Sequence, residues 1–465
     1  MAFIQSFGAA ETVTGSCHLL QLENGPNILI DCGYFQGEGE EKTYEPFDFD
    51  PKSVNIILVT HAHLDHVGRI PKLVKEGFDG KIVASRATMD LAEVVLMDSA
   101  KIAEEDYKLA FKKAKRSGTE KKVRPPIYTI DDAKAVFDLT IQYAQHNKSI
   151  QLTPNVKVTF RQAGHILGSS TVQVDFEEAG TTKSVVFSGD LGGRKDLIMP
   201  EPSVIKQTNA LFIESTYGDR NHCGLKETVD EFKEIVINTL NNKGNVLIPS
   251  FAIERSQEIL LLLKQMYYDK ELPQCQVFLD SPMAMRATQI YTAHHHELNE
   301  SAKQLLDRDG SVFDFPYLQY ALKSNESILI NKIESGCIII AGSGMCTGGR
   351  ILHHLKHRLW DETNSVIFVG YQVQGTLGRK LIDGVDSIQL YHENIKVNAK
   401  IHKVNGFSAH ADQHDLLGWI SEFEKIEHVF LIHGEPDKQS IFKQAIEEQL
   451  NIPTHIVRYA EKINI

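Results

Sequence analysis

The pattern of apolar and polar positions changes character along the chain. In the first 214 residues, short apolar runs bounded by turn residues predict the strands of a sheet, the clearest at 28–30, 54–59, 156–160, 171–176 and 184–187. Two stretches with helical periodicity, at 65–76 and 86–113, lie between these runs. This part of the chain therefore predicts a β-rich layered domain with helices outside.

From residue 215 onward, strand patterns alternate with helical ones. Apolar runs at 246–249, 275–279, 337–340 and 366–369 are separated by helical periodicity, which is typical of a parallel α/β sheet. The strand-rich pattern returns near residue 395. The simplest organisation is one domain interrupted by another. We expect an outer domain in two parts, residues 1–214 and 398–465, and an inserted parallel α/β domain at residues 215–397.

Length and composition agree with this organisation. The 465 residues are too many for one typical domain, and 42% hydrophobic with 24% charged residues is ordinary for a globular protein. We expect no membrane partner and no signal peptide, because no apolar run or N-terminal pattern supports either. The six scattered cysteines are most simply free thiols, which favours a cytoplasmic localisation.

The formal net charge of −12 does not favour broad adhesion to nucleic acid. One dense basic stretch departs from that balance, at residues 112–116 and 121–124, after the long helical pattern. Two interpretations stay open. A solvated, mobile connector is the more ordinary one for a charge run. A rim that attracts polyphosphate is the functional one.

The main chemical signal directly follows the apolar run at 54–59. Four potential metal ligands, His61, His63, Asp65 and His66, fall within six residues. Side chains alternate at a strand end, so we expect the first three to project to one side and His66 to mark the turn into a helix. A lone His-x-His would be a surface pair. The added carboxylate and third imidazole favour two adjacent metal ions, one on His61 and His63, the other on Asp65 and His66.

Three further side chains stand at predicted strand ends, and each alone would be an ordinary turn residue. His165 and Asp190 complete a set of three imidazoles and one carboxylate for the first ion. Asp190 can also reach the second ion, since each carboxylate oxygen can take one cation. Asp31 is better placed to accept a histidine N–H. One coordination position of the second ion would still lack a protein ligand.

These residues, in this order and spacing, resemble the metallo-β-lactamase superfamily. Later stretches are similar to its β-CASP branch. Residues 214–218 (Glu-Ser-Thr-Tyr-Gly) match motif A, 406–412 motif B and 431–435 motif C, while 249–258 and 343–350 match stretches common in RNA-cutting members. The likeness covers essentially the whole chain. It points to the ribonuclease group that includes the 3′-end-processing endonuclease and its bacterial and archaeal relatives.

The resemblance implies a fold, a metal content and a substrate. The fold would be a four-layer αββα metallo-β-lactamase domain with an inserted parallel α/β β-CASP domain. His433 would fill the vacancy on the second ion, and its presence argues for RNA, since DNA-processing members typically lack a histidine there. The expected enzyme is a di-zinc phosphodiesterase, an endoribonuclease with added exonuclease activity left open. Zinc is the default for this ligand set, and manganese is the alternative.

The expected catalytic residues are Asp65, Glu214 and His410. Two dications about 3.5–4 Å apart can hold a hydroxide and clamp a phosphoryl oxygen. By the resemblance, Glu214 and His410 pair near the leaving group, and cleavage leaves a 3′-hydroxyl and a 5′-phosphate. A carboxylate partner keeps an imidazole protonated, so His410 can donate a proton to the leaving oxygen. The alternative for this pair is a structural role at the domain junction.

A glycine-rich loop at residues 342–349 lies between a predicted strand and a helix, where backbone N–H groups suit a phosphate. An ordinary tight turn is the alternative. We expect Arg255, Ser343, Thr347 and Arg350 to bind the nucleic-acid backbone, and Cys346 to pack.

Two other functions stay open. One is hydrolysis of a small ester or thioester, which the insertion and the Glu214–His410 pair disfavour. The other is a non-catalytic RNA-processing subunit, which the complete ligand set disfavours. We expect no dedicated sequence-specific RNA-binding domain, and a homodimer is left open.

Overall fold

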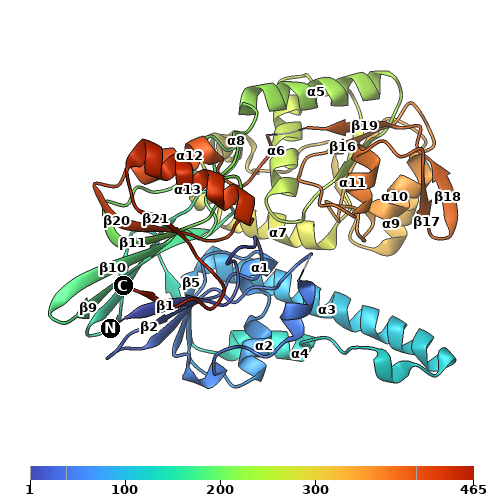
Figure 1. The fold of residues 1–465 in the computed structure, drawn as a ribbon. Helices are drawn as coiled ribbons and strands as arrows, with labels where there is room; N and C mark the ends of the chain where they lie inside the picture. Colours follow the sequence, from blue (N-terminus) through green and yellow to red (C-terminus); the bar gives the residue numbers. More distant parts are fainter. Residues whose placement is uncertain (1, 38, 405) are drawn as a thin grey trace. The chain divides into compact units, whose positions relative to one another are not determined.

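The structure, a computed structural model, describes residues 2–37, 39–404 and 406–465 (Figure 1). The chain divides into two compact units. Unit 1 comprises Met1–Arg194, Glu201–Asn221 and His410–Ile465, and unit 2 comprises Lys195–Pro200 and His222–Ala409. No helix in the described part of the chain is both long and apolar enough to cross a membrane. The six cysteines are free thiols, as predicted.

Unit 1 contains two seven-stranded sheets. Sheet A has the order β22 (Ile463–Asn464), β1 (Phe3–Ser6), β2 (His18–Gln21), β3 (Asn27–Ile30), β4 (Ile56–Leu58), β5 (Lys81–Ser85), β6 (Ile141–Ala144). Sheet B has the order β21 (Thr454–Ile456), β20 (Lys425–Leu431), β11 (Gln207–Ile213), β10 (Thr181–Phe187), β9 (Ser170–Glu178), β8 (Val156–Gln162), β7 (Ser149–Thr153). Strands β3 to β6 are parallel to one another, as are β10, β11, β20 and β21.

The two sheets pack face to face around one apolar core. Ile28 and Leu58 of sheet A share this core with Phe160, Val172 and Phe212 of sheet B. Alternate side chains of each strand point to the opposite face, and helices cover that face in both sheets. The helices beside sheet A are α1 (Leu64–Val67), α2 (Ile70–Lys75), α3 (Arg86–Ser117) and α4 (Ile130–Ala135), and those packed on sheet B are α12 (Gln413–Ser421) and α13 (Pro436–Leu450) (Figure 1). The predicted αββα layering is therefore confirmed.

Unit 2 is built on a six-stranded sheet whose strands are all parallel. Sheet C has the order β14 (Leu318–Tyr320), β13 (Gln276–Leu279), β15 (Cys337–Ala341), β12 (Val246–Pro249), β16 (Ser365–Phe368), β19 (Lys400–Lys403). Its helices are α5 (Leu225–Asn241), α6 (Arg255–Tyr268), α7 (Pro282–Ala293), α8 (Glu300–Asp309), α9 (Ser324–Ile330), α10 (Ile351–Arg358) and α11 (Leu377–Ile382). A two-stranded ribbon, β17 (Ser387–Leu390) and β18 (Glu393–Lys396), completes the unit. This is the predicted parallel α/β domain.

Three details differ from the sequence predictions. The inserted domain was predicted to begin at residue 215, whereas unit 1 continues to Asn221 and unit 2 also includes Lys195–Pro200. The predicted end of the inserted domain at residue 397 falls before β19, which pairs with β16, so unit 2 continues to Ala409. The strand before the histidine cluster is shorter than its apolar run, because β4 ends at Leu58. His61 and His63 therefore lie in a loop, and Asp65 and His66 lie in the first turn of α1 rather than at a strand end.

Candidate metal centre

The candidate site of unit 1 lies where parallel strands end. Asp31 directly follows β3, Glu214 follows β11, and Asp190 and His433 lie within three residues of the ends of β10 and β20. The carboxyl ends of parallel strands meet at one edge of a sheet, and the two sheets face each other, so these side chains converge. Asp31 and His433 have positive φ angles of 59° and 49°, which turn the chain sharply at this edge.

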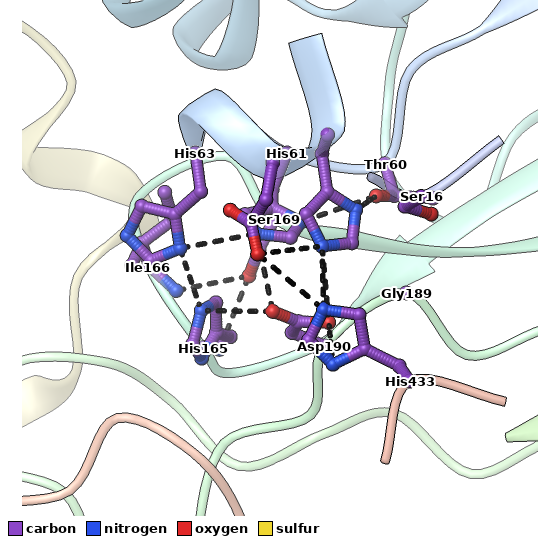
Figure 2. A network of polar contacts seen from close by, with 12 residues as sticks. Ser16, Thr60, His61, His63, His165, Ile166, Ser169, Gly189, Asp190 and His433 are labelled. Atoms are coloured by element: carbon purple, nitrogen blue, oxygen red, sulfur yellow. Dashed lines mark hydrogen bonds and ion pairs between the residues drawn. The ribbon is translucent and has the colours of Figure 1, made fainter. Parts of the chain in front are cut away.

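Four side chains form a first group of donor atoms. His63 Nδ1 lies 3.2 Å from His61 Nε2 and 3.1 Å from His165 Nε2 (Figure 2). Asp190 Oδ2 lies 3.4 Å from His61 Nε2 and 3.6 Å from His165 Nε2. Ligand atoms at tetrahedral corners about 2.0–2.1 Å from a zinc ion are about 3.4 Å apart. The four donor atoms thus have the mutual spacing that one tetrahedral cation requires.

A second group lies on the other oxygen of Asp190. His66 Nε2 is 3.3 Å from His433 Nε2 and 3.3 Å from Asp190 Oδ1. Asp65 Oδ2 is 3.5 Å from His433 Nε2 and 4.0 Å from His66 Nε2. The structure thus brings the distant His433 to the histidine cluster. Asp190 supplies one oxygen to each group.

Asp190 Oδ1 is a buried oxygen without a hydrogen bond among the described residues. Leaving a buried carboxylate oxygen without a hydrogen bond is costly, and such atoms call for an unseen partner. A cation between Asp190, His66, His433 and Asp65 would satisfy this oxygen. The residues present therefore fit a divalent metal.

Neighbouring side chains orient the imidazoles. Asp31 Oδ2 lies 2.7 Å from His66 Nδ1, and Asp31 also accepts hydrogen bonds of 2.8 Å from both the N–H and the hydroxyl of Thr60. The Thr216 hydroxyl lies 3.1 Å from His433 Nδ1. These contacts leave Nε2 of both rings directed at the second group. Sequence reasoning missed Thr60 and Thr216, although both lie inside motifs that it singled out.

The protonation states suit metal binding. Burial lowers the pKa of His61 well below its usual range and that of His63 to about 4, so both rings are neutral at pH 7, the form that binds metals. Burial would raise the pKa of Asp65, but a hydrogen bond to His433 and the charge of His66 lower it to about 2. Burial would lower the pKa of His66, but Asp190 and Asp31 raise it well above its usual range. A cation at Nε2 of His66 would replace that proton.

Glu214 and His410 form a pair beside the first group. His410 Nδ1 lies 3.2 Å and 3.1 Å from the two carboxylate oxygens of Glu214, and 3.9 Å from Asp190 Oδ2. Glu214 is fully buried, and its Oε1 accepts a hydrogen bond from the Leu191 N–H. Burial would lower the pKa of His410, but the charge and hydrogen bond of Glu214 raise it to about 9. His410 is therefore an imidazolium at neutral pH. Its side chain is about a fifth exposed and lies beside the donor groups.

The side chains predicted to bind the nucleic-acid backbone are placed in unit 2. Arg255 is buried, pairs with Glu258 and lies over the Phe407 ring. Arg350 Nη1 lies 2.6 Å from Asp280 Oδ1 and also donates to a backbone carbonyl. Both guanidinium groups are thus engaged in holding unit 2 together. The local sequence could not reveal the Arg350 pair, because Asp280 lies 70 residues away along the chain.

The glycine-rich loop of unit 2 closes on itself. Ser343 Oγ accepts a hydrogen bond of 2.9 Å from the Thr347 N–H, and the Thr347 side chain is exposed. Cys346 packs in a core cluster, and burial raises the pKa of its thiol to about 12. This thiol is therefore unreactive at neutral pH.

Sequence reasoning also missed a group of three acidic side chains in unit 2. Oxygens of Asp196, Glu254 and Glu258 lie within 4.8 Å of one another. Glu254 and Glu258 are four residues apart at the start of α6, which is a weak signal on its own, and Asp196 joins them from the Lys195–Pro200 segment.

Comparison with known proteins adds three family matches. Residues 11–147 match the metallo-beta-lactamase superfamily, residues 256–381 the Beta-Casp domain, and residues 394–457 the Zn-dependent metallo-hydrolase RNA specificity domain. A ribonuclease of Thermus thermophilus is 39% identical over 435 residues, which is 94% of this chain and 94% of that protein. These matches account for both units of the chain.

Two archaeal relatives and one solved structure agree with this. The transcription termination factor FttA of Methanocaldococcus jannaschii is 31% identical, over 99% of this chain and 71% of its own. An RNase J-like protein of the same organism is 30% identical, over 98% of each. The crystal structure of a protein of unknown function from Enterococcus faecalis V583 superposes over the whole of both chains with a TM-score of 0.57 and 12% identity, which supports the fold alone.

Proposed function

The chain belongs to the β-CASP branch of the metallo-β-lactamase superfamily, and from that premise we propose that it is a metal-dependent ribonuclease. The observation that carries the proposal is the pair of donor groups that share Asp190, with the Glu214–His410 pair beside them. RNA is the substrate, in keeping with the ribonuclease relatives and the match to an RNA specificity domain. This deepens the general family assignment to one reaction, hydrolysis of a phosphodiester bond.

Each donor group would hold one divalent ion. His61, His63 and His165 would bind the first and Asp65, His66 and His433 the second, with Asp190 bridging the two. Zinc is the first choice, because the groups contain five imidazoles and two carboxylates in all. When bound, such a pair of cations activates water and stabilises negative charge on a phosphoryl group.

The protein's own groups do the rest. His410 stays protonated because Glu214 holds its Nδ1, so the ring can pass a proton from Nε2 to the leaving oxygen. Glu214 acts by positioning, since its oxygens are committed to His410 and to the Leu191 N–H. Asp31 and Thr216 fix the rings of His66 and His433. Cleavage would leave a 3′-hydroxyl and a 5′-phosphate.

In unit 2, Ser343 and Thr347 remain the candidates for contact with the RNA backbone, because Thr347 is exposed on the glycine-rich loop. Arg255 and Arg350 would act indirectly, by holding the elements that carry this loop.

One assay tests the reaction and its mode. Linear RNA labelled at either end and a circular RNA of the same sequence are incubated with protein loaded with zinc or manganese, beside a matched Asp190→Asn preparation. Loss of the circle in the wild type alone supports an endoribonuclease. Shortening of linear RNA with intact circles would replace it by an exoribonuclease. Turnover of a thioester or lactone with no RNA cleavage would overturn the proposal.

A further inference from the structure

Helix α3 is much longer than the surface that it packs against. It runs for 32 residues, which corresponds to about 48 Å, and its buried residues end at Ala100. Beyond that point the helix runs outward from the sheets of unit 1 (Figure 1). Its next turns carry large exposed apolar side chains, among them Leu109 at 59% and Phe111 at 37% exposure. We call the part of α3 beyond Ala100 the helical arm. Exposing its apolar side chains to water is unfavourable, and the arm does not contribute to the core.

The arm is strongly basic in an acidic protein. Residues 108–124 contain eight lysines and arginines and one acidic residue, whereas the whole chain has a net charge of −12. Lys108, Lys112 and Lys115 are four and three residues apart, so they share one face of the helix, and Arg116 follows them. We call these four side chains the basic stripe. Within the described residues, the only ion pair of the stripe joins Lys108 to Glu104, and all four side chains are exposed.

We propose that the basic stripe binds the sugar-phosphate backbone of RNA, as an extension of the metal centre; this rests on the proposed ribonuclease function. A linear polyanion fits cations that repeat along one helix face at intervals of about 5 Å. Leu109 and Phe111 lie on either side of the stripe and offer apolar surface to unpaired bases. Bases stack on aromatic rings such as that of Phe111 without sequence preference. The site therefore adds affinity and not sequence selection.

The arm is anchored to the loop that carries a metal-ligand candidate. At the start of α3, the hydroxyls of Ser85 and Thr88 donate hydrogen bonds of 2.9 Å and 2.8 Å to the Gly168 carbonyl, three residues after His165. The stripe begins at Lys108, 22 residues after the start of the helix, which is about 33 Å along its axis. RNA bound at both places must span a comparable distance, so the stripe acts on long RNA and leaves short oligonucleotides unaffected.

The experiment compares two variants with the same change in net charge. The stripe variant replaces Lys108, Lys112, Lys115 and Arg116 by glutamine. The control replaces four lysines of unit 1 by glutamine: the exposed Lys206 and Lys425 and the partly exposed Lys157 and Lys443. RNA affinity is measured over a salt series with Asp190→Asn added to each protein, so that no RNA is cut. Cleavage of short and long RNA is measured without that change.

For the stripe variant we expect long-RNA affinity to fall about tenfold to a hundredfold at low salt. The slope of log K against log salt should become shallower by about two to three, at about 0.7 for each phosphate that is no longer neutralised. The control should keep the wild-type slope, and short oligonucleotides should be cut at the wild-type rate by both variants.

An unchanged salt slope in the stripe variant would overturn the proposal. So would an altered oligomeric state with unchanged RNA affinity, which would assign the stripe to a protein contact. If wild-type protein cuts no RNA, the proposed function fails, whatever the binding data show. Circular dichroism at 222 nm confirms that the glutamine variant keeps the helix.

Discussion

The two units each contain a buried group of acidic side chains, and the groups differ in what balances their charge. In unit 1, Asp190 and Asp65 lie among imidazoles, and their pKa values are held low by His433 and His66. In unit 2, burial raises the pKa of Glu258 to about 8 and that of Glu254 well above its usual range. The first group is ionised and rich in nitrogen donors. In the second, burial favours the protonated form of the carboxyl groups, and Glu258 pairs with Arg255.

One buried carboxylate oxygen in each unit illustrates this difference. Asp190 Oδ1 and Glu254 Oε1 both lack a hydrogen bond among the described residues. The Asp190 oxygen lies 3.3 Å from His66 Nε2, and a cation shared with that nitrogen would satisfy it. Burial raises the pKa of the Glu254 carboxyl well above its usual range, and its other oxygen already accepts a hydrogen bond from the Tyr291 hydroxyl. Proximity of carboxylates alone therefore does not make a metal site; neutral nitrogen donors and an ionised bridging oxygen do.

The largest expected effect comes from removing the bridge. Asp190→Asn should lower kcat/KM on RNA by at least about a thousandfold, because both ions lose a ligand and charge stabilisation is lost. Metal content by mass spectrometry should fall below that of the wild type. Wild-type cleavage in this variant would show that Asp190 is not part of the centre.

His410→Ala should have the next largest effect on activity. Loss of a proton donor to the leaving oxygen should lower kcat by about a hundredfold to ten-thousandfold. Metal content should be unchanged, which separates His410 from the ligands. A variant that lost one ion would instead place His410 among the ligands.

Asp31→Asn should weaken metal binding, and it should lower activity only as a consequence of that weaker binding. This carboxylate fixes the ring of His66, and the loss of such a partner typically weakens metal binding about tenfold to a hundredfold. Competition with a chromophoric chelator measures the affinity, and activity should return at high metal concentration. A defect that excess metal does not rescue would give Asp31 a different role.

Glu258→Gln tests the acidic group of unit 2. We expect little effect of this change on activity or metal content. The pKa of Glu258 is raised by burial, so its stabilising contribution is present below about pH 4.5 and is lost as pH rises through about 8. Unit 2 should therefore lose up to a few kcal/mol of unfolding free energy over this range. Asp196, Glu254 and Arg255 are the titratable or charged groups that face it.

Denaturant unfolding at several pH values measures this loss. Glu258→Gln should flatten the dependence, since glutamine does not titrate. An unchanged pH dependence, or a loss of bound metal, would contradict the assignment of this group as protonated and structural.

The sequence predicted much of the fold and most residues of the candidate centre. Strand and helix patterns predicted a β-rich layered domain and the parallel sheet of unit 2, because apolar periodicity follows directly from burial. The four-layer αββα arrangement of unit 1 was implied only by the resemblance. The sequence did not predict β22, a two-residue strand that pairs with β1 at the opposite end of the chain. Nor did it predict that β19 joins β16, since pairing partners are set by tertiary structure.

The residues of the centre were predicted unevenly, for physical reasons. His61, His63, Asp65 and His66 are dense in sequence and readable as ligands. His433 could be placed only by resemblance, since 367 residues separate it from His66. Thr60 and Thr216 have no composition signal, as their roles depend on one hydroxyl reaching one ring or carboxylate. Arg350 was predicted as a phosphate ligand because its partner Asp280 lies 70 residues away in the sequence. The partner of Arg255 is Glu258, three residues further on, and this local pair was missed.

The most direct test of the shared-Asp190 centre is a metal titration of chelator-stripped protein. Zinc or manganese is added in steps, and bound metal and RNA cleavage are measured on the same samples. We expect two bound ions per chain and full cleavage only when the second has bound. Full RNA cleavage by the stripped protein, or saturation at one ion per chain, would contradict the bridging role of Asp190.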